Sequence, residues 1–283
     1  MMKTPDRRRF THEAMNTIFR LDLPGVENSV AAGMARECFD RLDFLESRLS
    51  RFIEGSDVSR INHLKTGETL RISEECHACL LAALEGHART GGLFDVSLGR
   101  QIEHQKSSRS GQSPSPEGSL IIHPDTAAVT CQSPGREIDL GGIGKGYALD
   151  QLREILVDWG APGGLICAGA SSLLAFGEGS WPVDLPGGET GARIDLSAQA
   201  LSASGTGIQG NHIVHPGGEM PANPPTRIWV AATTATVAEI WSTALMLVET
   251  VEIASLTSRE AEISEIYFQH ERKNGELFCV TKD

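Results

Sequence analysis

The feature of this sequence that most constrains the fold is the stretch Ile138–Asp150, which reads IDLGGIGKGYALD. In it the end of an apolar strand meets Asp139, four glycines and Lys145, and an amphipathic helix follows. Glycines permit unusual backbone angles and let the main chain approach a ligand closely. The stretch is not a P-loop, because Gly146 stands where Ser or Thr should follow the lysine. Taken alone it leaves two interpretations open, a ligand-binding turn and a plain connection between strand and helix.

Apolar residues that recur at three- and four-residue steps predict helices over Val26–Leu49 and Ser73–Thr90. The second helix begins at a favourable serine N-cap and is followed by Gly91 and Gly92, a common C-terminal signal. Two further helices are predicted over Gly144–Trp159 and Thr236–Glu249. Short strand-like runs lie between the helices, and this mixture is typical of an α+β protein.

Two segments are predicted to be loops. Residues 50–70 are polar, and residues 101–118 are rich in Ser, Gln, Gly and Pro, which predicts a mobile surface connection. No internal repeat divides the chain. The length and composition predict one to two closely packed lobes.

The chain is acidic, with 37 Asp and Glu against 25 Lys and Arg and a formal charge of -12. This balance disfavours binding to nucleic-acid backbones, although a small anionic ligand can still bind where local backbone donors or a cation reverse the field. No run approaches the roughly 18 apolar residues of a membrane-spanning helix. The basic run Arg7–Arg9 is not followed by the apolar stretch of a signal peptide. We expect a cytoplasmic protein without a membrane span.

Six cysteines are scattered without the spacing of a disulfide framework, and an intracellular setting would keep them reduced. Cys76 and Cys79 form the one close pair. They fall within a predicted helix and lack a second pair to complete a zinc site. We interpret them as buried or half-buried helix residues.

Two further segments carry polar groups suited to chemistry. Glu239 and Thr243 are spaced i,i+4 and share one helix face with Ser242 beside them, which offers hard oxygen ligands for Mg²⁺ or a solvated face. The Gly-punctuated segment 202–216 reads as a loop and contains His212 and His215. Either histidine could act as a general base or contact a ligand, or lie at the surface.

Taken together, these segments resemble the FAD:protein FMN transferase (ApbE) family, and they occur in that family's order across nearly the whole chain. The family's DLGGIAKGYAVD motif is matched by Asp139–Asp150, with Gly144 in place of an alanine. Its ADALATAL helix is matched by Ala238–Leu245. Weaker matches are found at Met15–Thr17, Ser56–Asn62, Thr90–Gly99, Ser202–Gly205 and His212–Pro216.

The resemblance implies a single ApbE-like flavin transferase domain over residues 1–283. Its fold would be ApbE-like (T-fold-like) α+β, with mixed sheets packed with helices and an FAD cleft between lobes. It implies Mg²⁺-dependent transfer of FMN from FAD to a Thr or Ser hydroxyl of an acceptor protein, with release of AMP. The acceptor would carry a D-G-x-T-like sequence.

The resemblance also implies roles for individual residues. His212 would be the general base, and the Gly142 carbonyl would join Glu239 and Thr243 around Mg²⁺. The residues implied to lie at FAD are Met15, Asn62, Phe94, Asp95, Val96, Asp139, Lys145 and Ile213.

The chain departs from the family's pattern in several places. Glu239 replaces the usual aspartate, Gly169-Ala170-Ser171 replaces G-G-D/N, and the region between Gly99 and Ile138 lacks the family's L-W-G segment. Two alternatives to a working transferase therefore stay open. One is an FAD-binding or adaptor homologue with impaired catalysis, and the other is a hydrolase of the FAD pyrophosphate.

Overall fold

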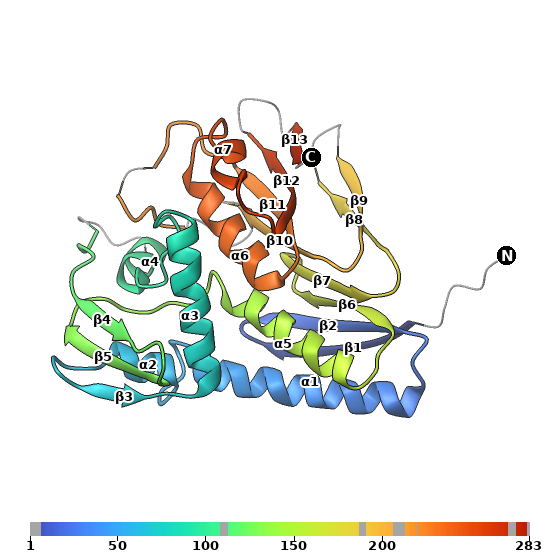
Figure 1. Cartoon of the computed structure of the whole chain (residues 1–283), viewed down its shortest axis with the longest axis horizontal. Coiled ribbons are helices and arrows are strands. Elements are labelled where there is room, and N and C mark those ends of the chain that lie inside the picture. Colours follow the sequence, from blue (N-terminus) through green and yellow to red (C-terminus); the bar gives the residue numbers. More distant parts are fainter. Residues whose placement is uncertain are drawn as a thin grey trace.

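An eight-stranded antiparallel sheet forms the framework of the computed structural model, which describes residues 7–107, 113–186, 191–205, 213–218, 220–270 and 276–281 (Figure 1). The strand order is β1-β2-β6-β7-β10-β11-β12-β13. The bounds are β1 (Arg7–Ala14), β2 (Thr17–Pro24), β6 (Gly163–Ala168), β7 (Ser172–Gly177), β10 (Ala200–Gly205), β11 (Arg227–Ala232), β12 (Ile263–Gln269) and β13 (Leu277–Thr281).

Both faces of this sheet are covered near its centre. Successive side chains of a strand point to opposite faces, so Leu165 and Cys167 of β6 pack on one side, and Ile166 and Ala168 pack on the other. The first side meets the two-stranded ribbon β8 (Trp181–Leu185) and β9 (Ala192–Leu196). The second side carries the main core beneath the helices, so β6 is buried along its whole length.

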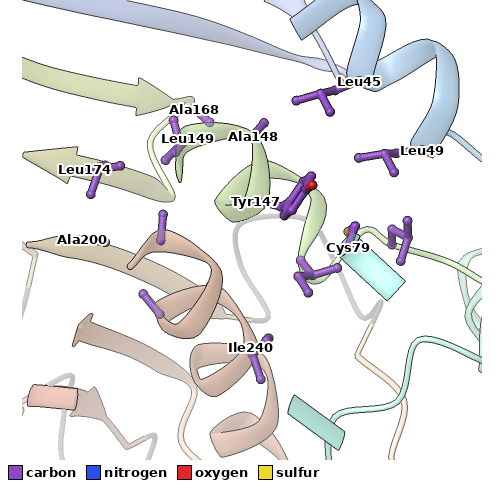
Figure 2. Close-up of a cluster of buried hydrophobic side chains, with 14 of the residues drawn as sticks. Leu45, Leu49, Cys79, Tyr147, Ala148, Leu149, Ala168, Leu174, Ala200 and Ile240 are labelled. Atoms are coloured by element: carbon purple, nitrogen blue, oxygen red, sulfur yellow. The ribbon is translucent and has the colours of Figure 1, made fainter. Parts of the chain in front are cut away.

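The second side is covered by α1 (Asn28–Leu49), α5 (Gly144–Asp158) and α6 (Ala235–Ala244), and α3 (Glu74–Arg89) packs against α1 and α6. Figure 2 shows Tyr147 and Leu149 of α5 within a cluster that includes Leu45 of α1 and Ile240 of α6. A methyl group added at Gly86 of α3 would meet the Ile240 side chain. The four helices therefore enclose one core, and the mixed α+β class predicted from the sequence is confirmed.

A three-stranded sheet with order β3-β5-β4 stands at the left of Figure 1, beyond α3. Its strands are β3 (Thr69–Arg71), β4 (Ser119–Ile122) and β5 (Ala128–Ser133), and the short helices α2 (Asp57–Asn62) and α4 (Gly99–Lys106) lie near it. The remaining elements are the 3-10 helix η1 (Leu245–Leu247) and α7 (Ile253–Thr257). No helix in the described ranges combines the length and apolar character needed to cross a bilayer.

Two predicted loops are partly helical. Within residues 50–70, α2 forms because Ser56 accepts a hydrogen bond from the Ser59 amide at 2.9 Å, while Val58 and Ile61 bury one face. The prediction of a mobile loop over residues 101–118 is wrong for the first six residues, which belong to α4.

The helix α4 is stabilised by a hydrogen bond between residues thirteen positions apart, which the local sequence does not indicate. The Gln101 side chain is buried and donates a hydrogen bond to the Pro114 carbonyl at 3.1 Å, which links α4 to the segment that returns toward β4. Residues 113–118 have no regular secondary structure, as expected of a loop, and residues 108–112 lie outside the described part of the chain.

The helices α5 and α6 bind each other's N-terminal backbone. Asp150 of α5 accepts hydrogen bonds from the Ala235 amide at 2.9 Å, the Thr236 amide at 2.8 Å and the Thr236 hydroxyl at 2.6 Å. In return, Glu239 of α6 accepts a hydrogen bond from the Gly146 amide at 2.5 Å, although α5 has no side-chain cap of its own. Burial raises the pKa of Asp150, against the hydrogen bonds that lower it. The carboxylates thus satisfy helix donors that would otherwise be buried without partners.

We predict that Asp150→Ala lowers the free energy of unfolding by about 1–3 kcal/mol, because it leaves buried backbone donors without acceptors. The measurement is urea denaturation followed by circular dichroism. Asp158→Ala is the matched control, because Asp158 is exposed at the other end of the same helix. Equal stability of the two variants would show that the contacts of Asp150 contribute nothing.

Candidate active site

The glycine-rich turn before α5 is held in one shape by its own backbone. The Asp139 amide donates to the Val96 carbonyl at 2.7 Å, and the Asp139 carboxylate accepts from the Gly141 amide at 2.8 Å. The Gly144 amide then closes the turn onto the Leu140 carbonyl at 2.7 Å. Asp139 is therefore a structural acceptor within the turn and also a wall residue of the cavities described below.

Asn62 and Arg51 clamp the chain just before this turn. Asn62 donates to the Ile138 carbonyl at 3.0 Å and accepts from the Ile138 amide at 2.7 Å, so its side chain pairs with that backbone as a strand neighbour would. Arg51 lies 2.7 Å from the Glu137 carboxylate and 3.2 Å from Asp139. No role was predicted for Arg51, because nothing local to residue 51 indicates a partner almost ninety residues away.

Lys145 and Glu239 meet where α5 and α6 come together. The Lys145 ammonium lies 2.5 Å from one Glu239 oxygen, while the other oxygen accepts from the Gly146 amide. The Ser172 hydroxyl lies 3.5 Å from the first oxygen. Glu239 is only 4% exposed, and a buried carboxylate is tolerated because donors surround it. The solvated helix face that the sequence left open for Glu239 is therefore excluded.

Two cavities adjoin this ion pair. The first measures about 110 Å³ and includes apolar walls from Phe94, Val96 and Ile213. The second measures about 660 Å³, within the size range of small-molecule sites, and is lined by Met15 and Phe52 among others. Both cavities are lined by Lys106, Asp139, Gly141, Lys145 and Ser171. A ligand placed across these shared residues would extend into both cavities.

Most residues predicted at the site line one or both cavities. The first cavity brings together Phe94, Asp95, Val96, Asp139, Gly142, Lys145, Ile213, Glu239 and Thr243. Met15 lines the second cavity, in a β1–β2 turn where Met15 and Asn16 both take positive φ, 50° and 57°. Asn62 lines neither cavity and lies behind the turn. His212 falls outside the described residues, so its role stays a prediction.

The sequence did not indicate that Ser202 and Ser204, at the first cavity, meet Ser242 of α6. Ser202 and Ser204 line the cavity, and their hydroxyls lie 3.1 and 3.0 Å from the buried hydroxyl of Ser242. The segment expected to be a loop from residue 202 is the strand β10 up to Gly205. Its pairing with β7 and β11 places alternate residues on the cavity side, which local composition did not indicate.

The predicted metal ligands offer oxygen donors of three kinds, a carboxylate, a hydroxyl and a carbonyl. Gly142 and Thr243 are close, since a methyl group built on Gly142 would lie 3.5 Å from the Thr243 hydroxyl oxygen. Such donors suit Mg²⁺. No cluster of three His, Cys, Asp or Glu side chains with metal-binding geometry occurs in the described ranges. The proposed ligands would not form such a cluster, because Glu239 is the one residue of these types among them.

All six cysteines are free thiols, and five of them are buried. Burial raises the pKa of Cys79 well above its ordinary value and raises the pKa of Cys76 as well. A thiolate, the form that binds zinc, is therefore disfavoured at both. The interpretation of this pair as buried helix residues is confirmed.

The fold and site define an α+β protein in which a glycine-rich strand-to-helix turn shares one cleft with a helix that carries a buried glutamate, Glu239. The model of the ApbE family matches residues 15–268, and the chain therefore belongs to the ApbE family. The FAD:protein FMN transferases of Salmonella typhimurium and Escherichia coli K12 are each 24% identical to it, over 88% of this chain and 80% of theirs.

Solved structures show the same fold. The flavin transferase ApbE from Vibrio cholerae superposes with a TM-score of 0.82 at 17% identity, covering 99% of this chain and 98% of that one. The ApbE protein from Thermotoga maritima gives 0.79 at 22% identity, covering 98% and 97%. At these identities the likeness concerns the fold, and the ApbE-like architecture implied by the sequence motifs is confirmed.

The first turn of α5 offers a sharp test of the α5–α6 contact. A methyl group at Gly146 would collide with the Ala235 carbonyl oxygen, whereas one at Gly144 would meet no atom within 4 Å. We predict that Gly146→Ala costs about 1–3 kcal/mol of folding free energy through overpacking. Gly144→Ala, the matched control, should be neutral or should stabilise by about 0.5–1 kcal/mol. Thermal denaturation measures both, and equal melting temperatures would contradict the contact.

Proposed function

We propose that this chain is an FAD:protein FMN transferase. The acceptor hydroxyl oxygen of a Thr or Ser forms a bond to the FMN phosphorus of FAD. The bond from that phosphorus to the bridging oxygen of the pyrophosphate breaks, and AMP leaves with the bonding electrons. The hydroxyl proton passes to a general base, for which His212 is the candidate from the sequence.

The observation that carries this proposal is the meeting of the glycine-rich turn with α6 at one cleft. A pyrophosphate needs positive charge beside it, and Lys145, at the start of α5, places an ammonium group at the junction of the two cavities. The names of the related proteins, FAD:protein FMN transferase, support the same reaction.

The cofactor-binding residues of the two cavities are proposed to contact different parts of FAD. The apolar part of the first cavity's wall, with Phe94 and Val96, suits contact with an aromatic ring of FAD. The larger second cavity, with Met15 at its wall, is roomy enough for the other half of the dinucleotide or for an acceptor segment. Asn62 acts through the turn that it braces, since both polar atoms of its amide are used by Ile138.

Mg²⁺ fits the donors present at Gly142, Glu239 and Thr243, which share the first cavity. When bound, the ion would neutralise negative charge on the phosphates and polarise the phosphorus that is attacked. Lys145 would orient the substrate at its phosphates, and the glycine-rich turn, held in shape by Asp139 and Asn62, would fix where Lys145 stands.

Two finer points belong to the same proposal. The acceptor is a protein with a D-G-x-T-like sequence, which the resemblance to the family implies. The cytoplasmic location follows from the residue patterns alone and is tested by fractionation of cells that express the protein at its natural level.

The reaction is tested by incubating the purified protein with FAD, Mg²⁺ and a peptide of D-G-x-T type. We expect a flavopeptide by mass spectrometry, with one AMP released for each peptide modified. Free FMN and AMP without flavopeptide would identify a pyrophosphate hydrolase instead. Retention of intact FAD without any product would identify a binding or adaptor protein. Either of these two results, hydrolysis or binding alone, overturns the proposal.

We predict that Asp139→Ala weakens FAD binding by about tenfold or more, because the turn loses the acceptor that holds the Gly141 amide. Fluorescence titration with FAD measures the affinity. Asp158→Ala is the control and should bind FAD as the wild type does. Unchanged affinity in Asp139→Ala would remove this residue from the site.

A further inference from the structure

The ion pair of Lys145 and Glu239 occupies the position where the metal is proposed to bind. The side chains are 14% and 5% exposed, and their charged atoms lie 2.5 Å apart. Within the described ranges, Glu239 is the one carboxylate recorded within salt-bridge distance of Lys145. The second Glu239 oxygen is held by the Gly146 amide. Both oxygens are thus committed to donors of the chain itself.

A cation that approaches Glu239 would therefore meet an ammonium group already in contact with it. Thr243 and Gly142, the other two proposed metal ligands, line the same cavity as the carboxylate that Lys145 holds. Two cations in contact with one carboxylate repel each other strongly where water is scarce. The Gly146 amide is fixed in α5, whereas the lysine ammonium stands on a flexible four-carbon stem and can move.

We propose that Mg²⁺ and Lys145 compete for Glu239, so that metal entry releases the Lys145 ammonium toward the diphosphate of the substrate. The inference rests on the proposed function for the identity of that diphosphate. Lys145 lines both cavities, so a released ammonium stays at their junction. Without metal, the charges of Lys145 and Glu239 cancel, and the cleft offers little attraction to phosphate. Metal and FAD consequently bind with positive cooperativity, because each favours the arrangement that the other needs.

The first test is a calorimetric titration of the whole chain with Mg²⁺ alone, without FAD or acceptor. Lys145→Met removes the competitor, so Mg²⁺ should bind about tenfold more tightly than to the wild type. Lys106→Met is the matched control: Lys106 lines the same two cavities, but Glu239 is not among its recorded ion pairs. Its Mg²⁺ affinity should stay within about twofold of the wild type. The proposal is overturned if Lys145→Met binds Mg²⁺ no more tightly than the wild type, or if both variants tighten equally.

A second measurement covers the chance that Lys145→Met folds poorly, since it leaves a buried carboxylate without a cation. Mg²⁺ should then raise the melting temperature of Lys145→Met more than that of the wild type, because ligands stabilise the state they bind. Glu239→Gln, alone or combined with Lys145→Met, should abolish both the heat of Mg²⁺ binding and the gain in melting temperature. A gain no larger than in the wild type, or Mg²⁺ binding that survives Glu239→Gln, contradicts the proposal.

The release of Lys145 is read from FAD titrations with and without Mg²⁺. The gain in FAD affinity on adding Mg²⁺ should be several-fold larger in the wild type than in Lys145→Met. An equal gain would show that the lysine does not reach the diphosphate. These measurements are separate from flavopeptide formation, so a chain that shows the expected Mg²⁺ pattern without flavopeptide supports the exchange while the transferase proposal fails. A chain that makes flavopeptide without the expected Mg²⁺ pattern supports the transferase proposal, while the exchange of Mg²⁺ for Lys145 fails.

Discussion

The close approach of the first turns of α5 and α6 is the contact on which the candidate site depends. Gly146 lies against the Ala235 carbonyl, where no side chain fits. One turn further along each helix, a carboxylate reaches back: Asp150 to the start of α6, and Glu239 to the start of α5. Each helix start carries partial positive charge, so the acids stabilise the contact electrostatically as well as by hydrogen bonding. This reciprocal pairing fixes the angle at which the glycine turn and α6 face the cleft.

Much of the polar chemistry around the cleft serves the chain itself. Asn62 is used by Ile138, and Asp139 by Gly141 and Arg51. These contacts are in place without a ligand, so the turn is shaped before a substrate arrives and less free energy is lost in ordering it. Besides these braced groups, the cavity walls carry the Lys145 ammonium, which is paired with Glu239, and the hydroxyls of Ser202 and Ser204.

Elements whose pattern lies within one segment were predicted correctly from the sequence. Helices α1, α3 and α5 follow their apolar spacing within two residues at each end, since long amphipathic helices are determined by local periodicity. The helix predicted over residues 236–249 ends instead at Ala244, where η1 continues as a tighter turn. The short helix α2 and strand β10 were predicted as loops, because six residues give too little periodicity to outweigh polar composition.

The sequence by itself determined the α+β class, the ApbE resemblance and most residues of the cleft, because glycine spacing and the i,i+4 pair on α6 depend only on neighbours along the chain. Tertiary structure alone decided what those side chains contact. Glu239 reaches Lys145 across 94 positions and Arg51 reaches Asp139 across 88. Such pairs form only once the core has brought α1, α5 and α6 together, and their partners leave no periodic signal in the sequence. Whether a carboxylate faces solvent, a metal or a lysine is therefore a property of the packing, not of the motif in which it occurs.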